Sequence, residues 1–308
     1  MKKLGYQAGA IALVLAAAWF LVATTLDNLA ARNIASGFGF LGREAGFEIG
    51  ESPLLGYSAA DTYLRALAVG LLNTFRVALA GVVLATLLGF VLGFFGLSKN
   101  LLLKGLSRAY VEFIRNTPLL VQLFFWYALI SDALPAPREA LQPLPGVFLS
   151  NRGIFFPLPG STPVLEGFGF TGGGALSPEF ATLLVGLVVY TGAFIAEIVR
   201  AGVLAVPRGQ VEAADALGLS HFEKTRTVVL PLALRVIVPP LTSQYLNLVK
   251  NSSLAVAIGY PDFVAVVNTA INQTGQAIEG IALIMAAYLT VSLAISGFMN
   301  WYNARVRA

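Results

Sequence analysis

The chain has 308 residues, of which 57% are hydrophobic and 12% are charged, and it contains no cysteine. Soluble domains carry roughly 25% charged residues, so this composition indicates an integral membrane protein. Without cysteine, disulfides, iron-sulfur clusters and thiolate metal sites are excluded, and the single histidine, His221, disfavours a histidine-based metal site. The net charge of +4 fits basic cytoplasmic loops, and no basic face with interleaved aromatics indicates nucleic acid as a partner.

Six apolar segments approach the length of about 20 helical residues that crosses a hydrocarbon core of about 30 Å. In chain order they are 8–26, 77–97, 118–134, 180–199, 236–258 and 281–301. The first follows Lys2 and Lys3, as in a signal peptide, but its apolar run exceeds the usual core of about 7 to 15 residues, so we expect a retained helix. The sequence therefore predicts an all-α integral membrane protein with six transmembrane helices.

Lysine and arginine predict the orientation of these spans. With the N-terminus inside, thirteen of them fall in inner segments and five in outer ones, namely Arg32, Arg43, Arg65, Arg138 and Arg152. Because cytoplasmic loops retain these cations, both termini are predicted to be cytoplasmic. Residues 1–64 would form an N-terminal helix with a periplasmic loop, and residues 65–308 the remaining five spans. The second periplasmic loop, 135–179, is rich in Pro and Gly, and we expect both loops to be irregular or to carry short interfacial helices.

The cytoplasmic segment 200–235 carries the signals of two short helices joined by a glycine. Pro207 suits a helix start, and Gly218 suits the left-handed position that ends a helix. Ser220 and Glu223 have the S-x-x-E spacing of a capping box. A solvated connector is the plain alternative for such a charged loop.

The order and spacing of residues within this segment resemble the EAA loop of ABC importer permeases. The matching residues are Glu212, Ala213, Ala214, Gly218, Val228, Leu230 and Pro231, with Val228 where isoleucine is commoner. From Leu67 onward the resemblance extends through GLLNTFRVALAG, VEFIRNTPLLVQLFFWY, YTGAFIAEIVRAG and SQYLNLVKNSSLAVAIGYPD to GFMNWYN. These segments are similar to the polar amino acid permeases, and most to the general L-amino-acid subgroup, which has an extra N-terminal helix and a long loop after NTPLLVQLFFWY.

The resemblance implies a five-helix permease core plus one N-terminal helix in the bacterial inner membrane. In the family the short helix of the loop docks on an ATP-binding subunit, and small Ala213 and Ala214 would permit close contact. It also implies two copies of that subunit, a second and paralogous permease chain, and a periplasmic amino-acid-binding protein. Since this chain has no G-x-x-x-x-G-K-[ST] sequence, we expect ATP and Mg to be bound by the partner ATPase and this chain to be no enzyme.

Two cations are placed in the middle to outer half of the bilayer: Arg76, about nine residues into a helix running inward from Leu67, and Lys250, about fourteen residues into one running outward from Val236. Charges at such depths face the bundle interior and often mark a pathway. Arg76 and Lys250 are therefore candidates for binding a substrate carboxylate. Polar groups near Lys250 complete the candidate pathway: Asn247, Asn251, Ser252 and Ser253. Alternatively, Arg76 bonds to backbone carbonyls and 250–253 marks a break in the helix. Glu197 is a weaker candidate, because its spacing from Arg200 favours an i,i+3 ion pair.

Three classes of function are weighed against one another. A secondary transporter driven by an ion gradient is the alternative function, but it would need acidic or histidine groups deep in the spans, and Glu197 near an edge is the one carboxylate there. An integral membrane enzyme would need a nucleophile, base or metal constellation that the residues do not supply. The sequence favours the membrane-spanning permease subunit of an ATP-driven importer for amino acids.

Overall fold

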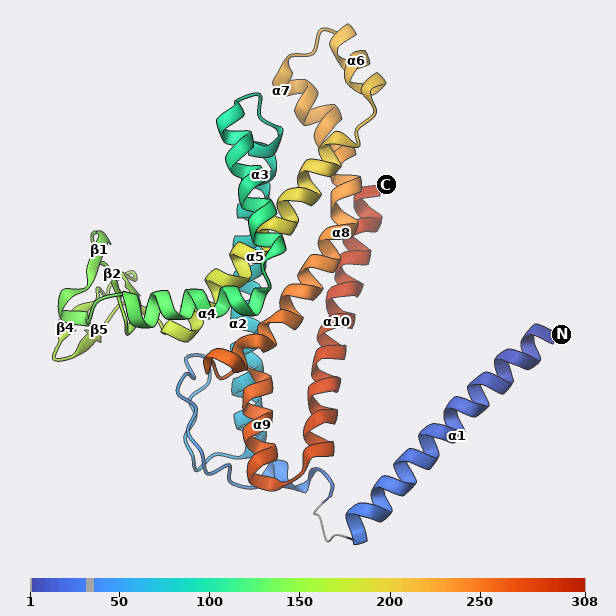
Figure 1. The fold of residues 1–308 in the computed structure, drawn as a ribbon, viewed down its shortest axis with the longest axis vertical. Helices are drawn as coiled ribbons and strands as arrows, with labels where there is room; N and C mark the ends of the chain where they lie inside the picture. The colour runs from blue at the N-terminus through green and yellow to red at the C-terminus, as the bar shows by residue number, and fades with distance from the viewer. Residues whose placement is uncertain (1, 32–35, 308) are drawn as a thin grey trace.

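The computed structural model describes residues 2–31 and 36–307 as a tall helical bundle with a small β region at its side (Figure 1). The α-helices are α1 (Lys2–Ala31), α2 (Tyr63–Leu97), α3 (Leu101–Asn116), α4 (Leu119–Ala128), α5 (Pro178–Leu204), α6 (Arg208–Ala216), α7 (His221–Lys224), α8 (Leu230–Asn251), α9 (Phe263–Thr274) and α10 (Ala277–Arg307). Short 3-10 or π-helical turns cover Phe38–Gly42, Leu129–Ala133, Pro137–Glu139, Thr225–Val229 and Ser252–Ile258. Helices α6 and α7 lie at one end of the bundle and α9 lies at the other (Figure 1).

Within the described residues, four helices are long and apolar enough to cross a membrane: α2, α5, the continuous helix His221–Ile258, and α10. The bent pair α3 and α4 makes a fifth if it counts as one span. Helix α1 contains a shorter apolar stretch, Gly9–Thr25, and stands away from the bundle (Figure 1). Four of the predicted spans thus lie inside longer helices, while the count of six, which depends on α1, stays a prediction.

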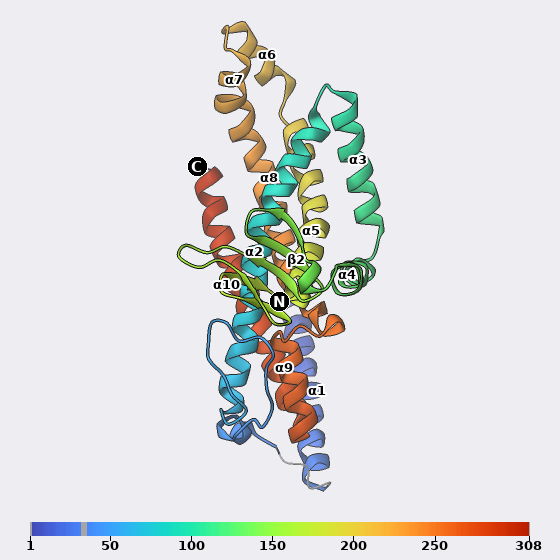
Figure 2. The ribbon, with the colours of Figure 1, turned by 90° about the vertical axis from the view of Figure 1, so that its left-hand side faces the viewer.

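The third predicted span, 118–134, is helical from Leu119 to Ala133, but this helix forms a sharply bent pair with α3. Helices α3 and α4 meet at an angle of 104°, and α4 is seen end-on beside α3 in Figure 2. Pro118 disfavours the helical conformation in the preceding residue, and Thr117 accordingly has extended backbone angles of φ −101° and ψ 127°. The amide of Gln122 holds the bend, because its Nε2 donates to the carbonyls of Ile114 and Thr117 at 3.0 Å each.

The outer segment 135–179 folds as antiparallel β structure, so the expectation of an all-α chain with irregular outer loops is wrong here. One sheet has the order β1 (Leu141–Leu144), β2 (Val147–Ser150), β3 (Gly153–Phe156) and β6 (Gly174–Leu176), and a hairpin joins β4 (Val164–Glu166) to β5 (Gly169–Thr171). The ring of Phe170 packs on those of Phe148 and Phe155, with centroids 4.6 and 4.7 Å apart. Strands of three or four residues are too short for an alternation pattern to stand out in the sequence.

The segment before α2 is ordered against the end of the bundle that carries α9. Phe40 packs edge to face on Tyr63, with ring centroids 5.6 Å apart, in an apolar cluster shared with α2 and α9. The Nε2 of Gln276 donates to the carbonyl of Gly37 at 2.8 Å and ties this segment to the turn between α9 and α10. Apart from the 3-10 turn at Phe38–Gly42, the described part of this segment is irregular, as the sequence indicated, although it is held by specific contacts. Helix α9 was not expected. Arg32, counted among the outer cations, lies outside the described residues.

Helices α2 and α5 form the centre of the bundle and approach closely at two glycines. A Cβ atom added at Gly89 would lie 2.5 Å from the side chain of Ile195, and one added at Gly93 would lie 2.8 Å from that of Val199. Both Ile195 and Val199 are fully buried. Small residues at such crossings are typical of membrane helices, which associate through close packing rather than through the hydrophobic effect.

Candidate functional site

The segment with the EAA spacing forms a helical hairpin at one end of the bundle (Figure 1). Helix α6 begins directly after Pro207 and α7 begins after Ser220, as the sequence predicted. The Ser220 hydroxyl accepts from the backbone N–H of Glu223, whose carboxylate accepts from the N–H of Ser220, so that the predicted capping box is confirmed.

The turn between the two helices is fixed by backbone bonds around Gly218. This residue has φ 71°, the left-handed conformation that glycine adopts without steric cost. The N–H of Leu219 donates to the carbonyl of Ala214 and the N–H of Gly218 donates to that of Asp215, which is the bonding pattern of a Schellman motif. Lys224 in α7 pairs with Asp215 in α6 at 2.6 Å, so the angle between the two helices is set on both sides of the turn.

The two alanines of the motif differ in their surroundings. Ala214 is 3% exposed and packs into the hairpin, whereas Glu212 and Ala213 are exposed. Ala214 is thus covered by the hairpin itself, and close contact of the two alanines with a partner stays a prediction. Leu217, four residues after Ala213 on the same helical face, is 79% exposed. Glu212, Ala213 and Leu217 thus remain open to a partner on this part of α6.

The last part of the motif lies in the helix that leads back into the bundle. Leu230 and Pro231 form the first turn of α8 inside the continuous helix His221–Ile258, with Leu230 half-buried and Pro231 exposed. Nearby, α5 and α8 touch closely, because a Cβ atom added at Gly202 would lie 2.3 Å from the side chain of Ile237. The hairpin is thus attached to two long helices that are themselves packed together.

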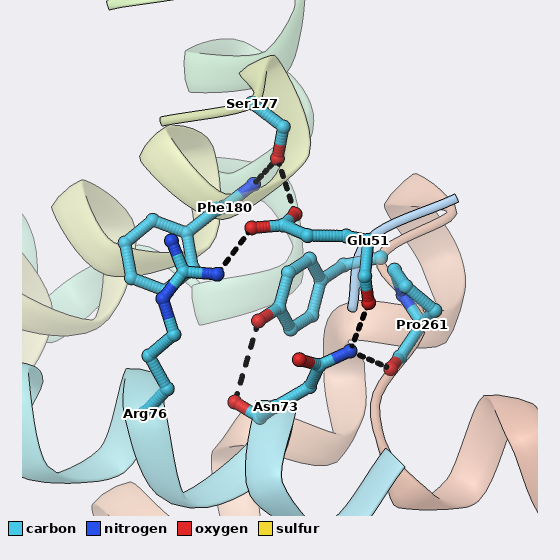
Figure 3. A network of polar contacts seen from close by, with 7 residues as sticks. Glu51, Asn73, Arg76, Ser177, Phe180 and Pro261 are labelled. Atoms are coloured by element: carbon cyan, nitrogen blue, oxygen red, sulfur yellow. Dashed lines mark hydrogen bonds and ion pairs between the residues drawn. The ribbon is translucent and has the colours of Figure 1, made fainter. Parts of the chain in front are cut away.

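At the other half of the bundle, Arg76 engages a carboxylate that the sequence analysis did not consider (Figure 3). Its guanidinium forms an ion pair with Glu51 and lies 4.1 Å from the ring centroid of Phe180. The other carboxylate oxygen of Glu51 accepts from the Ser177 hydroxyl at 2.6 Å, and that hydroxyl accepts from the N–H of Phe180 at 3.0 Å. The sequence led us to expect that Arg76 would bind a substrate carboxylate or backbone carbonyls. Neither expectation included this contact with a carboxylate of the chain itself.

The backbone of Glu51 is also held in place, by a side chain of α2 (Figure 3). The Nδ2 of Asn73 donates to the carbonyl of Glu51 at 2.8 Å and to that of Pro261 at 3.0 Å. The buried hydroxyl of Tyr260 donates to the carbonyl of Asn73 at 3.3 Å. The pair therefore joins the segment before α2, α2 itself, the start of α5, and the turn before α9.

A cavity of about 450 Å³ opens beside this pair, toward the end of the bundle that carries α9. It lies between the segment before α2, the start of α5 and the start of α9, and its lining includes the carboxylates of Glu48, Glu51 and Glu179. Its volume is within the range of small-molecule sites. These carboxylates suit a positively charged group in the cavity. Arg76 does not line the cavity but pairs with Glu51, which does.

The residues around Lys250 mark the end of a helix, as the alternative interpretation stated. Helix α8 ends at Asn251 and a 3-10 turn begins at Ser252. The hydroxyls of Ser252 and Ser253 donate back to the carbonyls of Val249 and Lys250, at 2.7 Å each. Among the described residues, no carboxylate lies within 4.0 Å of the exposed Lys250 ammonium, and Asn247 on the preceding turn is also exposed.

Glu197 is engaged with Arg200, as its spacing predicted. Two guanidinium nitrogens of Arg200 donate to the carboxylate, at 2.6 and 2.9 Å. This bidentate pair occupies both oxygens of Glu197. It lies between α5 and α3, away from the contacts of Arg76.

Sequence reasoning missed Glu51 as the partner of Arg76 and Ser177 as a partner of Glu51. Ser177 precedes Pro178 and Glu179 and caps α5 by accepting from the N–H of Phe180, which is a local signal that was available. Glu51 gave no such signal, because it stands in a segment without helical or strand periodicity, 25 positions before Arg76. Its role follows from the fold alone.

Comparison with known proteins gives concordant matches. A family described as "Binding-protein-dependent transport system inner membrane component" matches residues 81–308. The General L-amino acid transport system permease protein AapQ of Rhizobium johnstonii is 42% identical, with 99% of this chain and 92% of the relative covered. The putative amino-acid ABC transporter permease protein YhdX of Escherichia coli K12 is 43% identical, with 98% and 93% covered. A solved amino acid ABC transporter with histidines matches at a TM-score of 0.59 and 26% identity, covering 79% of this chain and 95% of that one. The chain therefore belongs to the family of binding-protein-dependent transport system inner membrane components.

Proposed function

We propose that this chain is the membrane-spanning permease subunit of an ATP-driven importer for amino acids. The observation that carries this proposal is the EAA spacing folded as a rigid hairpin whose exposed face, at Glu212, Ala213 and Leu217, is free for a partner. The two curated relatives described above are named as amino acid permeases, which supports the substrate class. The bonding of Glu197 to Arg200 does not favour the alternative of an ion-coupled transporter.

In the proposed assembly, six spans including α1 cross the bacterial inner membrane with both termini in the cytoplasm. The excess of lysine and arginine on the side of the hairpin supports this orientation. Two ATP-binding subunits, which hold ATP and Mg, dock at the hairpin of this chain and of a paralogous second permease chain. A periplasmic binding protein delivers the amino acid at the opposite end, beside the segment before α2.

The hairpin couples ATP hydrolysis to the spans through α5 and α8. A displacement of α6 is passed to α5 through the short link at Pro207 and to α8 through the continuous helix that begins at His221. Because Gly202 and Ile237 pack without space between them, α5 and α8 move together rather than separately. The fixed angle between α6 and α7 makes the hairpin a rigid lever.

For substrate passage, Arg76 and the outer cavity match the two charges of an amino acid. The carboxylates of Glu48 and Glu179 suit the ammonium group, and Arg76 suits the carboxylate, provided that Glu51 gives up its place. Lys250, together with Asn247, Asn251, Ser252 and Ser253, is a second candidate along the pathway. Glu197 serves as the partner of Arg200 in this proposal.

The proposal is tested by placing a bulky side chain on the open face of α6. Ala213→Trp should insert and purify normally but retain at least about tenfold less of the co-expressed ATPase in a pull-down, because close docking is blocked. Gly218→Val should act similarly, since a β-branched residue is strained at φ 71°. Thr162→Trp, in the exposed turn before β4, is the matched control and should retain the ATPase. If the Ala213→Trp chain retains as much ATPase as the unmutated chain, the hairpin is not the coupling element.

A further inference from the structure

A second cavity lies between α2, α3 and α5, at the end of the bundle that carries the hairpin. Its volume is about 350 Å³. Leu97 at the end of α2, Leu204 at the end of α5 and Lys104 in the first turn of α3 line it, so its mouth is at the level where these helices begin or end. Figure 1 shows α3 running from this end along the bundle. Neither the proposed docking face nor the Arg76 network uses this cavity.

The cavity has an excess of positive charge. Its lining contains four cations and two carboxylates: Lys104, Arg108, Arg115 and Arg200, with Glu112 and Glu197. Arg200 satisfies Glu197 through two hydrogen bonds, and Arg115 lies 5.0 Å from the ring centroid of Phe194. Among the described residues, no carboxylate oxygen lies within 4.0 Å of the charged nitrogens of Lys104, Arg108 or Arg115. An anion in the cavity would therefore find guanidinium and ammonium donors not already engaged in ion pairs.

Helix α3 carries cations on one face and exposed apolar side chains on the opposite face. Lys104, Arg108 and Arg115 are spaced by four and seven residues, which places them along one face of the helix. Leu102, Leu106 and Phe113 lie along the opposite face and are 69%, 61% and 70% exposed. A helix with a cationic face and an exposed apolar face near the end of membrane spans is typical of the boundary between headgroups and hydrocarbon.

We propose that this cavity binds the phosphate of an anionic phospholipid in the inner leaflet. Arg108 and Lys104 hold the phosphodiester, because guanidinium forms paired bonds to phosphate oxygens and ammonium adds a compact charge. Basic pockets between membrane helices on the cytoplasmic side are suited to such headgroups. The assignment to the inner leaflet rests on the orientation given under the proposed function. The binding of a phosphate by these cations does not depend on that orientation.

A free phosphate would meet the same cations, but the cavity also offers apolar contacts. Leu92, Val111 and Leu204 line it beside the charged groups, and such side chains suit the glycerol and upper acyl region of a lipid. A lipid is also delivered at the mouth of the cavity by the membrane itself, whereas a soluble anion must compete with the surrounding headgroups. The shared chemistry is a phosphate anion, and the lipid is the source that the lining favours.

The test is native mass spectrometry of the full-length chain purified in detergent and supplied with phosphatidylglycerol or phosphatidylcholine. The unmutated chain should retain phosphatidylglycerol at least about tenfold better than phosphatidylcholine. Lys104→Gln combined with Arg108→Gln should lower retention of phosphatidylglycerol by about tenfold or more, since two charge-assisted contacts are lost. The matched control is Lys99→Gln combined with Arg226→Gln. It removes two positive charges from the same end of the bundle but outside the cavity, and it should retain the lipid. Lys104→Arg combined with Arg108→Lys should also retain it, which separates loss of binding from loss of folding.

Equal retention of phosphatidylglycerol by the Lys104→Gln/Arg108→Gln chain and the unmutated chain would overturn the inference. Release of the lipid by millimolar inorganic phosphate would also overturn it, because the cavity would then prefer a soluble anion. The measurement needs neither ATP nor an ATPase subunit. A negative result here therefore leaves the ATPase pull-down with Ala213→Trp as a separate test of the proposed function.

Discussion

The ion pair between Arg76 and Glu51 is expected to stabilise the outer half of the bundle and also to control substrate passage. The two side chains are 20% and 15% exposed, so most of the pair is removed from water. Removing one partner of a fully buried pair costs about 3–5 kcal/mol, because the other charge is left uncompensated. With the remaining exposure, and with Ser177 still bonded to Glu51, we expect Arg76→Met or Glu51→Gln to cost about 2–3 kcal/mol each.

A double-mutant cycle separates the two roles. Since the double variant Arg76→Met/Glu51→Gln leaves neither charge alone, it should recover about half of the summed loss and give a coupling energy of about 2–3 kcal/mol. Thermal unfolding of the purified chain measures this, with each single variant melting about 3–5 °C lower. Uptake of amino acid by proteoliposomes containing the ATPase and the binding protein measures the second role. The double variant should be stable but should lose uptake, because the guanidinium of Arg76, which would donate hydrogen bonds to the substrate carboxylate, is gone.

Two results would refute this reasoning in different ways. If both single variants melt at the temperature of the unmutated chain, the contact of Arg76 with Glu51 does not hold the outer segments together. If the stable double variant takes up amino acid at the normal rate, Arg76 does not bind the substrate carboxylate and is a structural residue. Lys250→Met then becomes the variant to measure for the pathway.

Two further predictions concern packing and orientation. Gly89→Val should lower the free energy of unfolding by about 1–3 kcal/mol, because its Cβ would lie 2.5 Å from Ile195, whereas Gly105→Ala, at a helical glycine with open space, should be neutral or slightly stabilising in the same melting experiment. Thr162→Cys should react with an impermeant thiol reagent in cells whose outer membrane is permeable, and Ala216→Cys, exposed on α6, should react only after the inner membrane is opened. Reaction of both cysteines from outside would contradict the proposed orientation, and normal stability of Gly89→Val would contradict the close approach of α2 and α5.

The bend between α3 and α4 and the β region show where local patterns mislead. The apolar run 118–134 has the composition of a span, yet Pro118 forces an extended residue before it and Gln122 bonds across the turn, so direction changes by 104°. In 135–179 the prolines and glycines were correctly taken as turn signals. The strands between them are stabilised by pairing with one another and by contacts such as Phe148 with Phe170, which no single segment reveals.

The sequence by itself determined the lipid environment, the position of most helices and the structure of the hairpin of α6 and α7. These follow from interactions over a few residues: apolar content over the length of a helix, the left-handed turn at Gly218 and the capping box at Ser220. Such short-range terms are nearly independent of what the rest of the chain does.

Only the tertiary structure decided which side chains of these elements meet or remain open. Glu51 reaches Arg76 across 25 positions and Ser177 across 126, and no periodicity encodes contacts at such separations. Likewise, Ala213 and Ala214 are neighbours of the same type, but the fold of the hairpin buries Ala214 and leaves Ala213 exposed. Burial and ion pairing depend on how distant segments pack, because each results from displacing water by atoms that the local sequence does not contain.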